Sequence, residues 1–156
     1  MFRNVFKKTY AKIEPGNEKL DIPEGLWRKC KICKEPIFAE DVKANYYTCP
    51  KCGGYFRVHA YRRIEMLVDD GSFIEWNKTM PVSNPLDFPN YELKLEEERV
   101  KTKLNEAVVT GEATVGNVRI AIAVCDARFM MSSMGHVVGD KITAAIEKAT
   151  EEKMPV

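Results

Sequence analysis

Hydrophobic and polar positions in the C-terminal third of the chain follow first a strand pattern and then a helix pattern. Residues 107–115 and 118–125 are rich in β-branched side chains, and the Gly116-Asn117 pair between them is a two-residue hairpin signal. Residues 129–135 show no strand period. The apolar residues after them recur at helical spacing: Val138, Ile142, Ala145, Ile146 and Ala149. The pattern predicts a β-hairpin over 107–125, a loop, and a helix from about residue 136 to about residue 152.

The middle of the chain predicts two more helices, with a strand and a loop between them. Apolar residues at 60, 64, 67 and 68 share one helical face, and Gly71 supplies a left-handed stop after it. Residues 73–76 are expected to be extended, and the three prolines within 80–90 predict a surface loop. Charged residues at helical offsets predict a solvated helix over 91–106. Its expected partial contacts are Leu93, Val100 and Leu104.

Two Cys-x-x-Cys pairs carry the strongest chemical signal in the sequence. Cys30 and Cys33 are separated by fifteen residues from Cys49 and Cys52. Two knuckles joined by a hairpin of this length can bring four thiolates to one tetrahedral ion. We therefore predict a structural zinc ribbon with no open coordination position, in which residues 37–38 and 45–48 are the strands of the hairpin. Two disulfides, four unrelated thiols, and iron in place of zinc are the alternatives.

This interpretation divides the chain into three parts. Residues 1–26 contain two turns with Pro and Gly and little apolar periodicity, which predicts a flexible N-terminal arm. Residues 27–58 form the ribbon, which has almost no core of its own and depends on its metal to fold. Residues 59–156 form the larger part. With 156 residues, of which 45% are hydrophobic, the chain is long enough for a small module and one domain of ordinary size.

Positive charge is concentrated in the ribbon. Residues 27–58 hold seven basic and three acidic side chains, whereas the whole chain has a net charge of +1. Basic groups around a zinc knuckle can neutralise phosphates, so a module that binds RNA or DNA is an alternative function. The basic candidates are Lys29, Lys31, Lys34, Lys43, Lys51 and Arg57, and the aromatic candidates for base stacking are Tyr46, Tyr47, Tyr55 and Phe56. A solvated basic surface and a small aromatic ribbon core explain the same residues equally well.

The sequence gives no reason to expect a membrane or an oxidising compartment. The first ten residues lack the apolar stretch of a secretory signal, and the longest aliphatic run, Ile120–Cys125, is far shorter than a bilayer span. We therefore expect a cytoplasmic protein whose thiols stay reduced and hold metal. Cys125 lies on this aliphatic run and is expected to be a small core side chain.

The loop before the last predicted helix is the second candidate site. Free N–H groups at a helix N-terminus can meet a phosphate or an oxyanion, although many loops with Gly and Ser enter helices without binding anything. The chain has only two histidines, His59 and His136, and each is expected to be structural or solvent-facing.

A series of motifs from residue 23 to the last residue keeps the order and spacing of one family. The matching segments are Pro23-Glu-Gly-Leu-Trp27, the four cysteines with Cys49-Pro-Lys-Cys52, Arg63–Leu67, Asp69–Phe73, Tyr91, Lys94-Leu95, Glu106–Val108 with Gly111, and Phe129–Gly139. Together they resemble the β subunit of the acetyl-coenzyme A carboxylase carboxyltransferase of bacteria and plastids. The resemblance implies an α/β (α+β) fold, in which the four-cysteine ribbon precedes the first part of a crotonase-like (ClpP/crotonase) domain of β-β-α turns.

The resemblance also implies a reaction. The carboxyl group of carboxybiotin passes to acetyl-coenzyme A and gives malonyl-coenzyme A for fatty acid biosynthesis. Such a reaction needs an enolate held by backbone N–H donors, and the implied substrate-binding residues are Ser133, Met134 and Gly135. The implied cofactors are one structural Zn²⁺ and biotin on a carrier protein. The implied partners are a carboxyltransferase α subunit in an α2β2 heterotetramer, the biotin carboxyl carrier protein and biotin carboxylase.

Two features depart from the family pattern. The family usually has Gly at the position of Ser132, so Ser132 is expected to restrict the loop if its φ is positive. Family members also continue beyond the position of Val156 into further glycine-rich loops, where the catalytic groups are expected. We therefore expect this chain to be an N-terminal portion of the subunit, or one half of a split subunit, and to be inactive alone.

Overall fold

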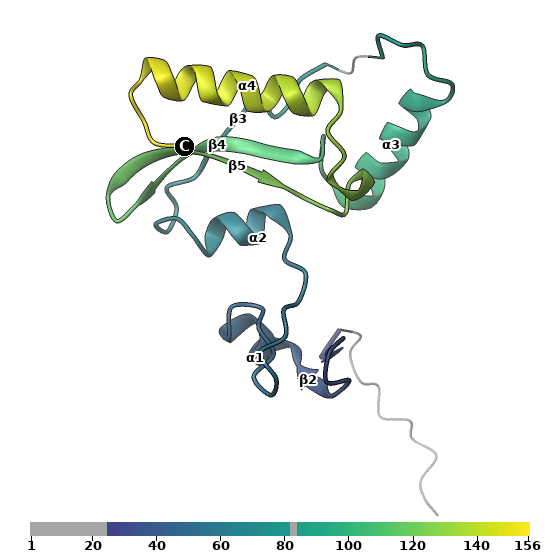
Figure 1. Ribbon diagram of the computed structural model, residues 1–156, viewed down its shortest axis with the longest axis vertical. Helices are drawn as coiled ribbons and strands as arrows, with labels where there is room; N and C mark the ends of the chain where they lie inside the picture. The colour runs from purple at the N-terminus through teal and green to yellow at the C-terminus, as the bar shows by residue number, and fades with distance from the viewer. Residues whose placement is uncertain (1–24, 82–83) are drawn as a thin grey trace, which may run out of the picture.

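The computed structural model describes residues 25–81 and 84–156. Figure 1 shows a small cysteine-bearing module at one end of the molecule and a three-stranded sheet at the other, with helix α4 on one face of the sheet and helix α2 on the opposite face. Most of the expected N-terminal arm lies outside the described residues. In the part of the chain that the structure describes, no helix is long and apolar enough to cross a membrane.

The cysteine-bearing module is built from two short strands and a helix. Strand β1 (Trp27–Lys29) pairs antiparallel with β2 (Pro36–Phe38), and helix α1 (Ala39–Ala44) follows directly. The prediction of a strand at 37–38 is confirmed, but the prediction of a strand at 45–48 is wrong. Tyr46 and Tyr47 have φ values of 49° and 59°, so the backbone turns there, and only Thr48 forms a bridge, to Tyr55.

Helix α2 (Ala60–Glu65) leads from this module to the sheet and is shorter than predicted. Ala60 and Ile64 are buried, while Leu67 lies beyond the helix and is 51% exposed. Gly71 has a φ of 72° and turns the chain into strand β3 (Ile74–Trp76), as expected. The described part of the proline-rich segment after β3 is irregular.

Helix α3 (Tyr91–Thr102) is solvated, as predicted, but it packs through different residues. Leu95 and Thr102 are the buried residues of the helix, whereas Leu93 and Val100 are 66% and 61% exposed. Leu104 is buried, but it lies after the helix. The spacing of the charged residues therefore predicted the helix correctly. Which of its residues are buried depends on the position of the sheet, which the local pattern does not contain.

The predicted β-hairpin is confirmed. Strand β4 (Val108–Val115) pairs antiparallel along its whole length with β5 (Val118–Cys125), and Gly116 and Asn117 both have positive φ, as a two-residue hairpin requires. Strand β3 pairs with the other edge of β4, so the strand order is β3-β4-β5. A short 3₁₀ turn η1 (Met130–Ser132) then precedes helix α4 (His136–Glu151), close to the predicted bounds.

Buried side chains form separate clusters in the module and around the sheet. The largest cluster joins α2 and α3 to β4 and α4, and it includes Ile64, Leu95, Val108, Phe129 and Val138. A second cluster lies within the cysteine-bearing module. The prediction that Cys125 is a core residue is wrong, because this thiol is exposed at the end of an edge strand.

Candidate metal centre and substrate loop

Two backbone knuckles of the same construction present the four cysteines. In the first knuckle the N–H of Cys30 donates to the carbonyl of Glu35 (2.9 Å), and the N–H of Lys34 donates back to the carbonyl of Cys30 (3.0 Å). The second knuckle repeats these bonds. The N–H of Cys49 donates to the carbonyl of Gly54 (2.7 Å), and the N–H of Gly53 donates to the carbonyl of Cys49 (2.9 Å).

The residue that closes each knuckle has a left-handed backbone. Lys34 has a φ of 63° and Gly53 has a φ of 72°. Gly53 adopts this conformation without strain because it has no Cβ.

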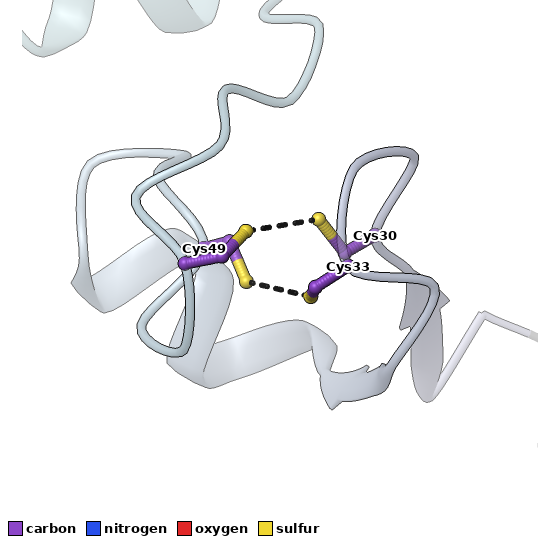
Figure 2. Close-up of side chains that lie close together, drawn as sticks. Cys30, Cys33 and Cys49 are labelled. Carbon is purple, nitrogen blue, oxygen red and sulfur yellow. Dashed lines mark hydrogen bonds between the residues drawn. The ribbon is translucent and has the colours of Figure 1, made fainter.

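The sulfur positions fit a tetrahedral metal site. All four Sγ atoms lie within 4.8 Å of one another, and the Cys30–Cys52 and Cys33–Cys49 separations are 3.7 and 3.8 Å. Figure 2 shows the two knuckles facing one another across this gap. A tetrahedral ion with Zn–S bonds of about 2.3 Å places its sulfurs roughly 3.8 Å apart, whereas a disulfide bond is only about 2.05 Å long. The arrangement therefore fits a four-thiolate ion and does not fit the disulfide alternative.

The electrostatics of the cluster also favour a bound cation. The backbone N–H of Cys33 is the main cause that lowers the pKa of Cys30 to about 6, against the opposing effect of burial. For Cys33 the N–H of Glu35 lowers the pKa, but burial and the three neighbouring thiols outweigh it and raise the pKa to about 12. Four adjacent thiols can lose their protons together at neutral pH only if a cation balances their charge. We therefore retain zinc as the ion, with iron as the alternative that thiolate ligands leave open.

The loop before α4 has a left-handed backbone. Met130, Met131 and Ser132 have φ values of 42°, 56° and 60°. Ser132 was expected to restrict the loop if its φ is positive, and its φ is positive. Side chains of Met131 and Met134 on either side of the turn are 69% and 68% exposed, so the loop presents its backbone and two flexible apolar groups at the surface.

Hydrogen bonds within the loop decide which backbone donors are available. The N–H of Ser133 donates to Met130 O (3.1 Å), and the N–H of Gly135 donates to Ser133 O (3.1 Å). Among the described residues, the N–H of Met134 forms no such bond, and α4 has no side-chain cap at its first turn. Of the three predicted substrate-binding residues, only Met134 therefore keeps a free N–H, next to the unpaired N–H groups of the first turn of α4.

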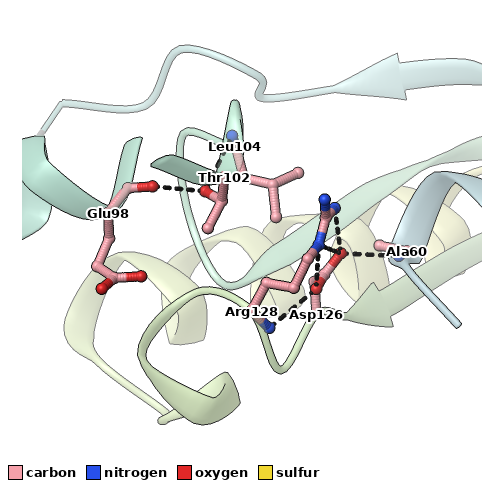
Figure 3. Close-up of polar contacts among 6 residues, drawn as sticks. All are labelled: Ala60, Glu98, Thr102, Leu104, Asp126 and Arg128. Carbon is pink, nitrogen blue, oxygen red and sulfur yellow. Dashed lines mark hydrogen bonds and ion pairs between the residues drawn. The ribbon is translucent and has the colours of Figure 1, made fainter. Parts of the chain in front are cut away.

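A buried carboxylate just before this loop was not found from the sequence. Asp126 is 2% exposed and accepts hydrogen bonds from Ala60 N (2.8 Å), from Arg128 N (3.0 Å) and from the Arg128 guanidinium (2.8 to 3.2 Å). Figure 3 shows this group between the start of α2 and the end of β5. The Asp-x-Arg sequence after a strand could have indicated the pair of Asp126 and Arg128. The contact to Ala60 could not be found in this way, because it joins residues 66 positions apart.

The ribbon residues that were candidates for nucleic-acid binding differ in their exposure and in their ion pairs. Tyr47 is buried and Phe56 packs against the ribbon core, while Tyr46 and Tyr55 are 71% and 86% exposed. Lys43 and Lys51 are paired with Glu40 (2.6 Å) and Glu35 (3.0 Å). The four aromatic side chains therefore do not form one stacking surface.

The two histidines lie apart from the metal cluster. His136 is exposed and forms a pair with Asp140, at 3.0 Å between Nδ1 and Oδ2. His59 precedes α2.

The four-cysteine ribbon and the β-β-α arrangement define a zinc-ribbon protein with an α/β fold. A solved single-chain, multi-domain long-chain acyl-CoA carboxylase shares this fold, with a TM-score of 0.52 over 64% of this chain and 10% of that chain at 23% identity. A family model described as the acetyl-CoA carboxylase zinc finger domain matches residues 27–52.

Sequence comparison identifies the relatives within this class. The chain is 44% identical over 156 residues to the acetyl-coenzyme A carboxylase carboxyl transferase subunit beta of Carboxydothermus hydrogenoformans. It is 44% identical over 164 residues to the subunit of the same name from Desulforamulus reducens. Each alignment covers 100% of this chain but only 56% and 57% of the relative. The chain thus corresponds to the N-terminal part of these β subunits, and the resemblance found in its motifs is confirmed.

Proposed function

We propose that the chain supplies the N-terminal part of a carboxyltransferase that moves the carboxyl group of carboxybiotin to acetyl-coenzyme A. The observation that carries this proposal is the 44% identity to two β subunits over the full length of the chain. The proposed partners are a carboxyltransferase α subunit, the biotin carboxyl carrier protein and biotin carboxylase. Because the chain spans about half the length of these relatives, the remainder of the site is expected from segments that correspond to their other half.

In the proposed reaction the carboxyl carbon exchanges its bond to the biotin nitrogen for a bond to the methyl carbon of acetyl-coenzyme A. A proton leaves the methyl carbon of acetyl-coenzyme A, a C–C bond forms to the carboxyl carbon, the C–N bond of carboxybiotin breaks, and the biotin nitrogen takes a proton. Negative charge develops on the thioester oxygen during this exchange, and backbone N–H donors aimed at that oxygen would stabilise it. In this chain the donors available for that role are the N–H of Met134 and those of the first turn of α4.

The four cysteines have a structural role in this proposal. Four protein ligands fill the tetrahedral coordination of Zn²⁺, so no position is open to a water or a substrate. The ion would stabilise the ribbon, and the carboxyl transfer would take place at the loop and at segments supplied by the rest of the assembly. We further propose that residues 27–58 and 59–156 are separate structural units.

A chimeric subunit tests the proposal directly. This chain would replace the corresponding part of the Carboxydothermus hydrogenoformans β subunit, and the chimera would be co-expressed with the α subunit of that organism. We expect the purified assembly to form acetyl-coenzyme A from malonyl-coenzyme A in a manner that depends on added biocytin, while the 156-residue chain alone forms none. An assembly that contains zinc and the α subunit but has no biocytin-dependent turnover would contradict the proposal.

A proline substitution in the same chimera tests the loop. Met134→Pro removes the free N–H, and Ser133 already has the extended backbone (φ −62°, ψ 139°) that a following proline requires. Loss of one oxyanion donor lowers kcat by about a hundredfold or more. Met134→Leu keeps the N–H and a side chain of similar size, so it serves as the matched control. Equal kcat values for the two variants would show that this N–H does not contact the thioester oxygen.

A further inference from the structure

A basic cavity lies where the ribbon meets helix α2. Its volume is about 400 Å³, and the basic side chains that line it are Arg28, Lys29, Lys31, Arg57 and His59. Two aromatic rings, of Tyr55 and Phe56, complete the wall. The cavity therefore combines several cations with a flat apolar surface within a volume that suits a small ligand.

The positive charge of this cavity is not balanced within the described residues. Arg28, Lys29, Lys31 and Arg57 form no ion pair there, although eleven ion pairs occur elsewhere in that part of the chain. Among the residues that the structure describes, no carboxylate lines the cavity, and Asp126 is buried and bonded to Arg128. Four like charges around one concavity repel one another, and an anionic ligand with several negative charges would relieve that repulsion.

The aromatic side chains favour a single nucleotide over a nucleic-acid strand. A protein that binds single strands places successive aromatic rings along a groove several nucleotides long. Here Tyr55 is the exposed ring of the cavity wall, Phe56 is partly buried, and Tyr47 lies in the ribbon core, where Arg28 and Arg62 contact its ring. One exposed ring beside four cations suits one base with its phosphate groups.

The position of the cavity connects it to the loop before α4. The backbone N–H of Ala60, the residue after His59, donates to Asp126 (2.8 Å), and Asp126 also accepts a hydrogen bond from the Arg128 guanidinium (2.8 Å). Arg128 is followed directly by Phe129 and the turn at Met130–Ser132. One short segment, residues 126–135, therefore runs from the edge of the basic cavity to the proposed substrate loop.

We propose that this cavity binds the phosphorylated adenosine end of coenzyme A, so that its thioester end can reach the loop at Ser133–Gly135. This inference rests on the proposed function, because it takes coenzyme A as the substrate carrier. The phosphates would contact Arg28, Lys29, Lys31 and Arg57, and the adenine ring would stack on Tyr55.

Direct binding measurements on the zinc-loaded chain test the inference without turnover. The probe is adenosine 3′,5′-bisphosphate, titrated by calorimetry at low and at moderate salt. We expect saturable binding that weakens with salt, and at least a tenfold loss of affinity in the double variant Lys29→Glu/Arg57→Glu. The double variant Lys103→Glu/Lys153→Glu makes the same change in net charge at two exposed lysines elsewhere. It is expected to bind like the unmodified chain, and all proteins are checked for zinc content.

Three results would overturn the inference. The first is no binding of the probe by the unmodified chain, and the second is an equal loss of affinity in both double variants. The third is binding that requires an oligonucleotide and strengthens with its length, which would assign the cavity to nucleic acid. Active chimeric enzyme without probe binding would overturn this inference alone, whereas probe binding with an inactive chimera would contradict the proposed function and leave a nucleotide site.

Discussion

Ser132 is held in a backbone conformation that side chains disfavour. Its φ of 60° follows two methionines with φ values of 42° and 56°, so three residues without glycine occupy the left-handed region in succession. Each such residue is less stable there by about 1 kcal/mol, because Cβ approaches the carbonyl oxygen. The loop conformation is therefore maintained by its surroundings, chiefly by buried Phe129 before it and by α4 after it.

Substitutions at Ser132 test this strain. Ser132→Gly is expected to stabilise the protein or leave it unchanged, because relief of strain is partly offset by the greater entropy of glycine in the unfolded chain. Ser132→Val is expected to destabilise it by about 1 to 2 kcal/mol, since a β-branched side chain tolerates positive φ least. The free energies of unfolding of the two variants and of the unmodified protein are measured by urea denaturation. A valine variant as stable as the glycine variant would show that this φ is not fixed.

Asp126 fixes the start of α2 to the end of β5. Burial raises the pKa of its carboxyl group, but hydrogen bonds from the Arg128 guanidinium and from the N–H groups of Ala60 and Arg128 outweigh this effect and lower the pKa to about 2. The ionised form is therefore favoured in the folded protein.

The low pKa of Asp126 predicts a loss of stability in acid. The folded pKa lies below the unfolded value of about 3.9, so the stabilisation of about 2 kcal/mol is present above pH 4 and is lost as the pH falls toward 2. Asp126→Asn is expected to lose a similar amount at pH 7 and to show a smaller decline between pH 4 and pH 2. Urea denaturation of both proteins across this range measures the difference. Parallel pH curves for the two would contradict the assignment.

Helix α4 packs on β4 through a buried lysine. Lys141 is 2% exposed, and its Nζ donates to the carbonyl of Val108 at 3.0 Å. Burial lowers the pKa of this ammonium group, and the charges of Glu75 and Glu106 oppose the effect only in part. An amphipathic helix with a lysine on its buried face is not expected from the sequence pattern, which places this residue with the solvated positions.

The lowered pKa of Lys141 predicts that stability rises with pH. Because the folded pKa lies below the unfolded value of about 10.4, the charged form is disfavoured in the folded protein, and this penalty decreases as the pH approaches 10. In Lys141→Met the rise between pH 7 and pH 10 should be smaller. Lys148→Met, at a half-exposed position of the same helix, is the control. If the stability of Lys141→Met rises with pH as much as that of the unmodified protein, other groups cause the pH dependence.

At the scale of the whole molecule, the hydrophobic cluster of the ribbon has few contacts with the two clusters around the sheet. The ribbon cluster contains Cys30, Ile37, Val42, Tyr47 and Cys49, and Met66 at the end of α2 packs against it. The sheet has its own, larger cluster. Five buried residues are a small core for a folded module, so the ribbon depends on its four-thiolate ion.

Removal of the metal should therefore unfold one end of the molecule only. After chelation of zinc, or in Cys49→Ser, we expect amide hydrogen exchange to become fast across residues 27–58, while β4 and β5 keep their protection. Hydrogen exchange with mass spectrometry gives the regional rates, and zinc content per chain gives the occupancy. Restoration by added zinc is the control for chelation. Loss of protection in β4 and β5 as well would mean that the ribbon and the sheet fold as one unit.

The sequence by itself determined the features that depend on local spacing. The two Cys-x-x-Cys pairs, the Gly116-Asn117 turn and the apolar period of α4 are each set within a few residues, so pattern alone located the ribbon, the hairpin and the last helix. Helix α1 was missed although Ala39 and Val42 have helical spacing, because six residues give too short a period to distinguish from a polar connection.

Only the tertiary structure decided which of these features meet. Asp126 bonds to Ala60 across 66 residues, Lys141 reaches Val108, and the basic residues before Cys33 meet those after Cys52 around one cavity. Cys125 is exposed at the end of an edge strand, and its place at the edge of the sheet is not contained in any local pattern. Such contacts depend on the packing of elements distant in the chain, which buries Asp126 and Lys141 and so shifts their pKa values, and which gathers the basic residues of the cavity.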